Sequence, residues 1–257
     1  MNIHMNCYIH EPRLEELSLI ERELFELYLE TNNFKQAAPS NHKRDYIRGY
    51  VESLLRNKEQ ATILDLACGD ANALRETKKQ FGNNVYTVGV DIGLPPGHLT
   101  EEDLSYVDEY ITTPMEFLPL EWDNRFDYIS SCQGLRYTFF PFRALSEIAR
   151  VLAPNSHTYI DALYDFHWFP EWNDEKLKKW EDKIKERNLD DDKNYTSRRF
   201  YTDASWRRFC AKIADNYHDT IMNQMEKIHE KYGIIHNINR PYSEQYGYMV
   251  NSVEMKK

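Results

Sequence analysis

The stretch that decides the fold is ILDLACGDANAL, residues 63–74. The apolar run at 62–66 predicts a buried strand and the pattern at 71–81 predicts a helix, so a tight turn lies between them. Gly69 lets the backbone of that turn approach a ligand closely. Open α/β sheets bind ligands at the carboxyl ends of their strands, and this turn is at such an end.

The segments on the carboxyl side of this turn continue the alternation. Strand-like runs at 85–90, 109–112, 126–131 and 157–163 are separated by helix-like segments at 101–107 and 142–152. This spacing predicts an α/β fold with a Rossmann-like, doubly wound and mostly parallel sheet. The stretches GIIHNIN and YGYMVNSVEM near the end predict an antiparallel C-terminal addition.

Two helical additions flank the predicted sheet. Leucines at helical spacing after Pro12 and a second amphipathic stretch at 46–55 predict a helical N-terminal cap over 1–60. Residues 61–257 then form the ligand-binding domain, with a helical and aromatic insertion at about 164–232 after the fifth strand. The long apolar stripe at 203–232 fits either core packing or an oligomer contact, and the sequence leaves both open.

Composition narrows the functional classes. The chain has 257 residues, with 32 Lys and Arg against 42 Asp and Glu, so its formal net charge is −10. This balance argues against a general nucleic-acid binder, whose phosphate contacts need clustered cations. The four cysteines form no CxxC pair, which is typical of reduced thiols in the cytoplasm and not of a disulfide framework or a metal site. No apolar run approaches the roughly 18 residues of a membrane span, and no signal peptide is expected.

The acidic residues around the turn favour one kind of adenosine ligand. Asp91 follows the second strand, 22 residues after Gly69, where a carboxylate can accept hydrogen bonds from both ribose hydroxyls. A dinucleotide would bring its pyrophosphate to a turn that carries Asp65 and Asp70, and these would repel it. S-adenosylmethionine brings an ammonium and a sulfonium instead, which carboxylates attract.

With these features, residues 61–163 resemble the class I S-adenosylmethionine-dependent methyltransferase family. Five segments carry the resemblance in the family's order: 63–71, 88–92, 115–119, 126–132 and 147–154. The resemblance implies a methyltransferase that uses S-adenosylmethionine. It assigns Asp65 to the ammonium of the cofactor, Ala67 and Gly69 to its methionine part, Asp91 to the ribose, Ile92 and Met115 to the adenine, and Cys132 to the methionine end.

The sequence departs from the family's pattern at three positions. Ala67 and Ala71 replace expected glycines, so the turn must tolerate a Cβ atom. Pro114 stands where many members carry an acidic residue for the adenine amino group, so packing becomes the main hold on the adenine.

The aromatic stretch YDFHWFPEW, 164–172, follows the fifth strand and should lie at the cofactor end of the sheet. Tyr164, Trp168 and Phe169 are candidates for the wall of a substrate pocket that takes an aromatic ring or a cation, and core packing is the alternative. His167 and His98 are candidate general bases, which a phenol or alcohol substrate would need more than an amine would. A surface or hydrogen-bonded histidine is the alternative for each.

The leading hypothesis is therefore an enzyme that moves a methyl group to an N or O atom of a small molecule. Two alternatives stay open: a methyltransferase that acts on RNA or protein, and a non-catalytic, S-adenosylmethionine-binding regulatory protein. The acidic chain and its aromatic additions favour the small molecule. The sequence Ser-Ser-Cys-Gln-Gly at 130–134 lacks the Asn-Pro-Pro-Tyr type of signature, which by family analogy counts against base N6 chemistry.

Overall fold

A computed structural model of the chain describes residues 6–17, 19, 22, 25–26, 29, 41–95, 97, 99–132, 134–135, 138, 140–161, 217–239, 242–243, 248–249 and 252–257. The predictions for His98, for His167 and for the Tyr164, Trp168 and Phe169 cluster lie outside these described residues. The chain divides into two compact units, Met1–Arg13 with Phe34–Tyr164 and Ile228–Lys257, and Leu14–Asn33 with Asp165–Lys227.

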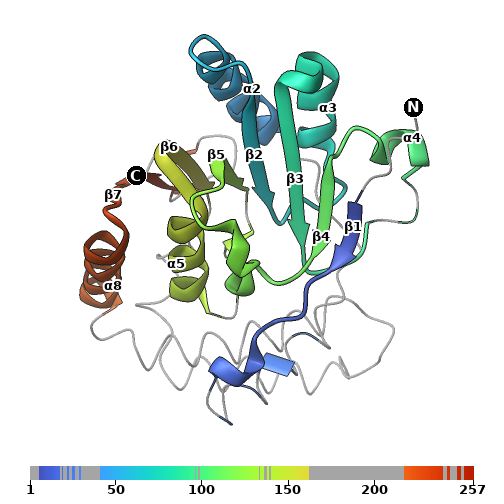
Figure 1. The fold of residues 1–257 in the computed structure, drawn as a ribbon. Coiled ribbons are helices and arrows are strands. Elements are labelled where there is room, and N and C mark those ends of the chain that lie inside the picture. Colours follow the sequence, from blue (N-terminus) through green and yellow to red (C-terminus); the bar gives the residue numbers. More distant parts are fainter. Residues whose placement is uncertain are drawn as a thin grey trace. The chain divides into compact units, whose positions relative to one another are not determined.

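The first unit is built on an eight-stranded sheet in the order β1-β4-β3-β2-β5-β6-β10-β7 (Figure 1). The strands from β1 to β6 pair in parallel, whereas β10 pairs antiparallel with both β6 and β7. The predicted mostly parallel sheet with an antiparallel C-terminal strand is therefore confirmed. The strand bounds are β1 Asn6–Ile9, β2 Ala61–Leu66, β3 Val85–Asp91, β4 Glu109–Thr112, β5 Phe126–Ser131, β6 Leu152–Asp161, β7 Ile235–Asn239 and β10 Ser252–Lys256.

Helices connect these strands and cover the sheet. The crossovers β2-α3-β3 and β5-α5-β6 move across the sheet in opposite directions, so right-handed connections put α3 and α5 on opposite faces. The described helices are α2 Asn41–Leu55, α3 Asn72–Phe81, α4 Glu101–Leu104, α5 Pro141–Val151 and α8 Tyr217–Tyr232, with short 3-10 turns η1 Leu14–Glu16, η2 Gly82–Asn84, η3 Met115–Phe117 and η4 Leu120–Trp122. A separate antiparallel pair is formed by β8 Tyr242–Ser243 and β9 Tyr248–Met249.

The N-terminal segment is not entirely helical, and the prediction is wrong at Asn6–Ile9. These residues form β1, which pairs with β4 so that Cys7 lies opposite Tyr110. Tyr and Ile favour strands, and the helical leucine spacing begins only at Leu14. The predicted second helix is confirmed as α2, and its buried Ile47 and Val51 pack into the core of the sheet.

The strand order reverses between β2 and β5. From β2 the chain proceeds outward to β3 and β4, and it then returns to the other side of β2 as β5. In open α/β sheets, ligands bind beyond the carboxyl ends of the strands at such a reversal. The turn after β2 and the loop after β5 are therefore where a ligand is expected. Among the described residues, no helix has the length and apolarity to cross a bilayer.

Candidate functional site

The turn after β2 has left-handed backbone at three positions. The φ angle is 54° at Ala67, 58° at Gly69 and 54° at Ala71. Left-handed backbone costs a residue with a Cβ atom about 1–2 kcal/mol, and it costs glycine nothing comparable. Backbone hydrogen bonds hold the turn in place, from Cys68 N to Val90 O at 3.0 Å and from Ala71 N to Cys68 O at 2.9 Å. The two alanines that replace expected glycines thus stand where glycine would be relaxed.

Asp91, at the carboxyl end of β3, binds this turn directly. Its Oδ2 accepts a hydrogen bond from Gly69 N at 2.7 Å, and its Oδ1 accepts one from Gly93 N at 3.4 Å. The structure therefore brings together the glycine and the carboxylate that the sequence placed on neighbouring strand ends. A carboxylate has about four acceptor positions, so a carboxylate in this place can accept from backbone amides and from ligand hydroxyls.

Gly134, in the loop after β5, marks the place where three segments meet. A Cβ atom on Gly134 would lie 2.5 Å from Ala67 Cβ, 2.6 Å from Ser131 Oγ and 3.1 Å from Met115 Cε. The turn after β2, the start of η3 and the end of β5 therefore converge here, and Cys132 lies half-buried between Ser131 and this glycine in the chain. Gly134 and Ser131 could not be identified as site residues from the sequence, because they meet Ala67 and Met115 only when distant segments come together.

The other acidic groups of the turn are engaged elsewhere. Asp65 is fully buried, and its Oδ1 accepts a hydrogen bond at 2.8 Å from Ser130 Oγ on the neighbouring strand. Asp70 Oδ1 accepts a hydrogen bond from Asn72 N at 3.0 Å, and its Oδ2 lies 3.7 Å from the buried Arg75. Arg75 also forms a closer ion pair with Asp103, so it offsets the charge of Asp70 only in part. Of these three carboxylates, Asp91 is the one that binds Gly69.

Tyr110 on β4 makes a contact that the sequence analysis missed. Its side chain is 1% exposed, and its hydroxyl donates to Gly69 O at 2.9 Å. On the neighbouring strand β3, Gly89 is in register with Tyr110. A Cβ atom on Gly89 would lie 2.8 Å from Cys68 Sγ. An isolated glycine inside a strand indicates a close approach by another part of the chain, so Gly89 was the available signal.

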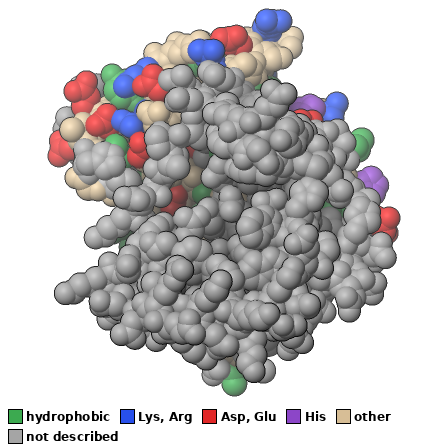
Figure 2. Space-filling view, turned by 180° about the vertical axis from the view of Figure 1, so that it is seen from behind, with side chains coloured by type: hydrophobic (Ala, Val, Ile, Leu, Met, Phe, Trp, Pro, Cys, Tyr) green, Lys and Arg blue, Asp and Glu red, His purple; other side chains and the backbone are tan. Residues whose placement is uncertain are grey.

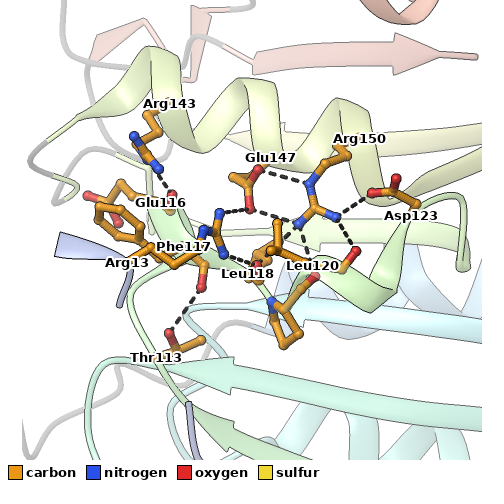
Figure 3. Close-up of polar contacts among 11 residues, drawn as sticks. Arg13, Thr113, Glu116, Phe117, Leu118, Leu120, Asp123, Arg143, Glu147 and Arg150 are labelled. Atoms are coloured by element: carbon orange, nitrogen blue, oxygen red, sulfur yellow. Dashed lines mark hydrogen bonds and ion pairs between the residues drawn. The ribbon is translucent and has the colours of Figure 1, made fainter. Parts of the chain in front are cut away.

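Arginines hold the segment that follows Met115 (Figure 3). Arg143 on α5 donates from Nε to Glu116 O at 2.9 Å, and its guanidinium lies 4.1 Å from the centroid of the Phe117 ring. Arg13 and Arg150 bind the next carbonyls, with hydrogen bonds from Arg13 Nη1 to Leu118 O at 2.8 Å and from Arg150 Nη2 to Leu118 O at 3.2 Å and Pro119 O at 3.0 Å. These contacts fix the backbone beside Met115, which is 7% exposed. Ile92 is half-buried just after Asp91.

A strand-order reversal, a strained turn after β2 and a carboxylate after β3 define a class of α/β proteins that bind a nucleoside-containing ligand. Residues 64–160 match the family model described as a methyltransferase domain. The part of the chain from β2 to β6 is therefore similar to methyltransferase domains. A comparison with curated proteins gives no match.

Similar solved structures share little sequence with this chain. The CurJ carbon methyltransferase is 13% identical, with a TM-score of 0.52, and the match covers 94% of this chain and 61% of that one. A methyltransferase in complex with the Haloferax volcanii Trm112 activator is 19% identical, with a TM-score of 0.34 and coverages of 48% and 61%. The plantazolicin methyltransferase BpumL, bound to a triazolic desmethylPZN analog and SAH, is 15% identical, with a TM-score of 0.46 and coverages of 93% and 92%. The chain thus spans about three fifths of the length of the first two, and the likeness to CurJ shows the fold.

Proposed function

We propose that the turn after β2 and Asp91 form the S-adenosylmethionine site, and that the enzyme methylates an N or O atom of a small molecule. The observation that carries the site is the 2.7 Å hydrogen bond between Gly69 N and Asp91 Oδ2, beside the strand-order reversal. This hydrogen bond places a carboxylate, and a glycine backbone that a ligand can approach closely, at the edge where such sheets bind ligands.

Each part of the cofactor then has a partner. Asp91 receives the ribose hydroxyls, and the backbone of Ala67 and Gly69 contacts the methionine part. The buried Asp65 contributes negative charge beneath the turn, which favours the ammonium and the sulfonium. The adenine packs against Ile92 and Met115, and Cys132 lies towards the methionine end.

Methyl transfer requires little chemistry from the protein. A lone pair on the substrate N or O attacks the methyl carbon as the carbon–sulfur bond breaks, and the bonding electrons pass to sulfur to give S-adenosylhomocysteine. The acceptor atom then loses its proton to solvent or to a base, for which His98 and His167 are candidates. Alignment of the reactants can contribute on the order of 7–11 kcal/mol. Tyr164, Trp168 and Phe169 are candidates for the pocket that aligns the substrate.

Charge supports a small-molecule substrate over RNA. The formal net charge is −10, and basic and acidic side chains are interspersed on the described surface in Figure 2. On α3, for example, Lys78 Nζ lies 2.8 Å from Asp108 and Lys79 Nζ lies 3.3 Å from Glu76. A groove that binds a nucleic-acid backbone needs cations that are free for phosphates.

Calorimetric titration with S-adenosylhomocysteine tests the site. We expect wild type to bind and Asp91→Ala to bind about 10–150-fold more weakly, which is the ~1.5–3 kcal/mol of hydrogen bonds to a charged group. Glu76→Ala removes an exposed carboxylate on α3 and serves as the matched control, with an unchanged dissociation constant. Equal affinities in wild type and Asp91→Ala would show that Asp91 does not hold the ribose.

Transfer of labelled methyl groups tests the substrate class. The protein is incubated with methyl-labelled S-adenosylmethionine in three separate reactions, which contain the small-molecule, the RNA or the protein fraction of a cell extract. Label in the small-molecule fraction supports the proposal, and label only in RNA or protein overturns it. Cofactor binding without transfer to any fraction would instead indicate a regulatory protein.

A further inference from the structure

We infer that Tyr110 is a positioning residue for the cofactor: by holding the Gly69 carbonyl it fixes the turn in which Gly69 N–H meets Asp91. The inference rests on the site proposed above. Tyr110 does not touch the reacting atoms, and it acts through the backbone of the turn.

Gly69 is held through both of its backbone polar groups. Its N–H donates to Asp91 Oδ2 at 2.7 Å, and its carbonyl accepts from the Tyr110 hydroxyl at 2.9 Å. The two partners come from different strands, β3 and β4, so the sheet itself sets the position of the glycine. A left-handed φ of 58° between two strained alanines would otherwise relax, because glycine restricts its own backbone least.

The surroundings of Tyr110 are built for this hydrogen bond. The strand β3 lies between β4 and β2, and its residue Gly89 is paired in register with Tyr110 on β4. Because a Cβ atom on Gly89 would lie 2.8 Å from Cys68 Sγ, the glycine leaves the room that the turn occupies. Burial raises the pKa of Tyr110, and the charges of Cys68 and Asp91 raise this pKa further. The phenol therefore keeps its proton and remains a donor throughout the ordinary assay range.

Tyr110→Phe removes the hydroxyl and keeps the ring. The lost hydrogen bond should raise the dissociation constant for S-adenosylhomocysteine about 3- to 10-fold, in line with one neutral hydrogen bond. Tyr86→Phe is the matched control, because the Tyr86 hydroxyl donates to Glu109 Oε1 at 2.7 Å near the amino end of β3, away from the turn. Both variants lose one hydroxyl from the same sheet.

Three measurements are made on the full chain of each variant: the dissociation constant by calorimetry, the melting temperature, and the hydrogen exchange of the Gly69 amide by NMR. We expect weaker binding and faster Gly69 exchange in Tyr110→Phe. In Tyr86→Phe we expect the dissociation constant and the Gly69 exchange rate of wild type, even if both variants lose the same amount of melting temperature.

An unchanged dissociation constant in Tyr110→Phe overturns the inference, and so does an equal loss of affinity in both variants, since that reports general destabilisation. If wild type does not bind S-adenosylhomocysteine, the proposed cofactor site fails instead. The exchange of the Gly69 amide in the unliganded protein then still decides whether Tyr110 positions the turn: faster exchange in Tyr110→Phe alone supports it, and equal exchange overturns it.

Discussion

Replacing Ala67 by glycine tests the strain in the turn after β2. Ala67 has a φ of 54° and is only half-buried, so glycine relieves left-handed strain with little loss of packing. The relief is about 1–2 kcal/mol, and the greater freedom of glycine in the unfolded chain offsets roughly 0.5–1 kcal/mol of it. The difference between these two ranges is about 0–1.5 kcal/mol. We expect the free energy of unfolding to rise by the middle of that range, about 0.5–1 kcal/mol.

Replacing Ala73 by glycine should instead lower the free energy of unfolding. Ala73 is buried inside α3, where glycine costs about 1 kcal/mol relative to alanine and the lost methyl adds about 0.8 kcal/mol. Ala71→Gly should be nearly neutral, because its φ is also 54° but its side chain is fully buried, so the lost methyl offsets the relieved strain.

Differential scanning calorimetry of the three variants measures these effects. At about 2–4 °C per kcal/mol for a domain of this size, Ala67→Gly should raise the melting temperature by roughly 1–4 °C. Ala73→Gly should lower it by several degrees, and Ala71→Gly should leave it close to wild type. A lower melting temperature for Ala67→Gly would refute the strain, because the greater freedom of glycine in the unfolded chain would then outweigh any strain relieved at this half-buried position.

Three further outcomes follow from the described contacts. Gly134→Ala should destabilise the protein by about 1–3 kcal/mol through overpacking, and it should weaken cofactor binding. Gly49→Ala, in open space on α2, should instead stabilise the protein by ~0.8–1 kcal/mol. Urea unfolding measures the stability of both variants, and calorimetric titration measures their binding of S-adenosylhomocysteine. Burial lowers the pKa of His157, so the unfolded chain takes up a proton first as the pH falls through about 6.5, and the stability present above that pH is progressively lost as the pH falls further, through the lowered pKa of the folded state. His157→Gln should flatten that part of the profile of melting temperature against pH, and an unchanged slope would contradict this. Arg143→Ala should weaken binding of S-adenosylhomocysteine through the backbone beside Met115, and Lys at position 143 should restore less than half of the lost affinity if the planar stacking on Phe117 matters.

The sheet could be predicted because its signals are local. The strands β2 and β5 are buried runs followed by the helices α3 and α5 of period 3.6, and both patterns are visible within about thirty residues. The strand β1 escaped prediction because it has four residues and its partner β4 lies about a hundred residues away. Pairing at that separation leaves no local pattern, and the leucine spacing that starts at Leu14 dominated the interpretation of the N-terminal segment.

In the candidate site too, some contacts could be predicted from local sequence signals and others could not. Gly69 and Asp91 follow neighbouring strands, so their meeting could be expected from strand order, and the structure brings them together. The partners of Asp70 could not be predicted from its position in the turn, because Arg75 lies one helical turn later and is shared with the distant Asp103. Ser131, Gly134 and Tyr110 act across segments, and only the glycine at 89 gave any sign of such packing.

Strain and anchoring together suggest how this turn works without two of its usual glycines. An alanine in left-handed backbone stores energy that glycine would not, and such strain persists only where the surrounding structure holds it. Here the holding groups are Asp91 and Tyr110, which bind the glycine between the two alanines. A turn fixed in this way before the ligand arrives loses little conformational freedom on binding, which favours affinity. Ala67→Gly should therefore raise stability without strengthening binding of S-adenosylhomocysteine, and tighter binding in that variant would show that the turn must move to admit the cofactor.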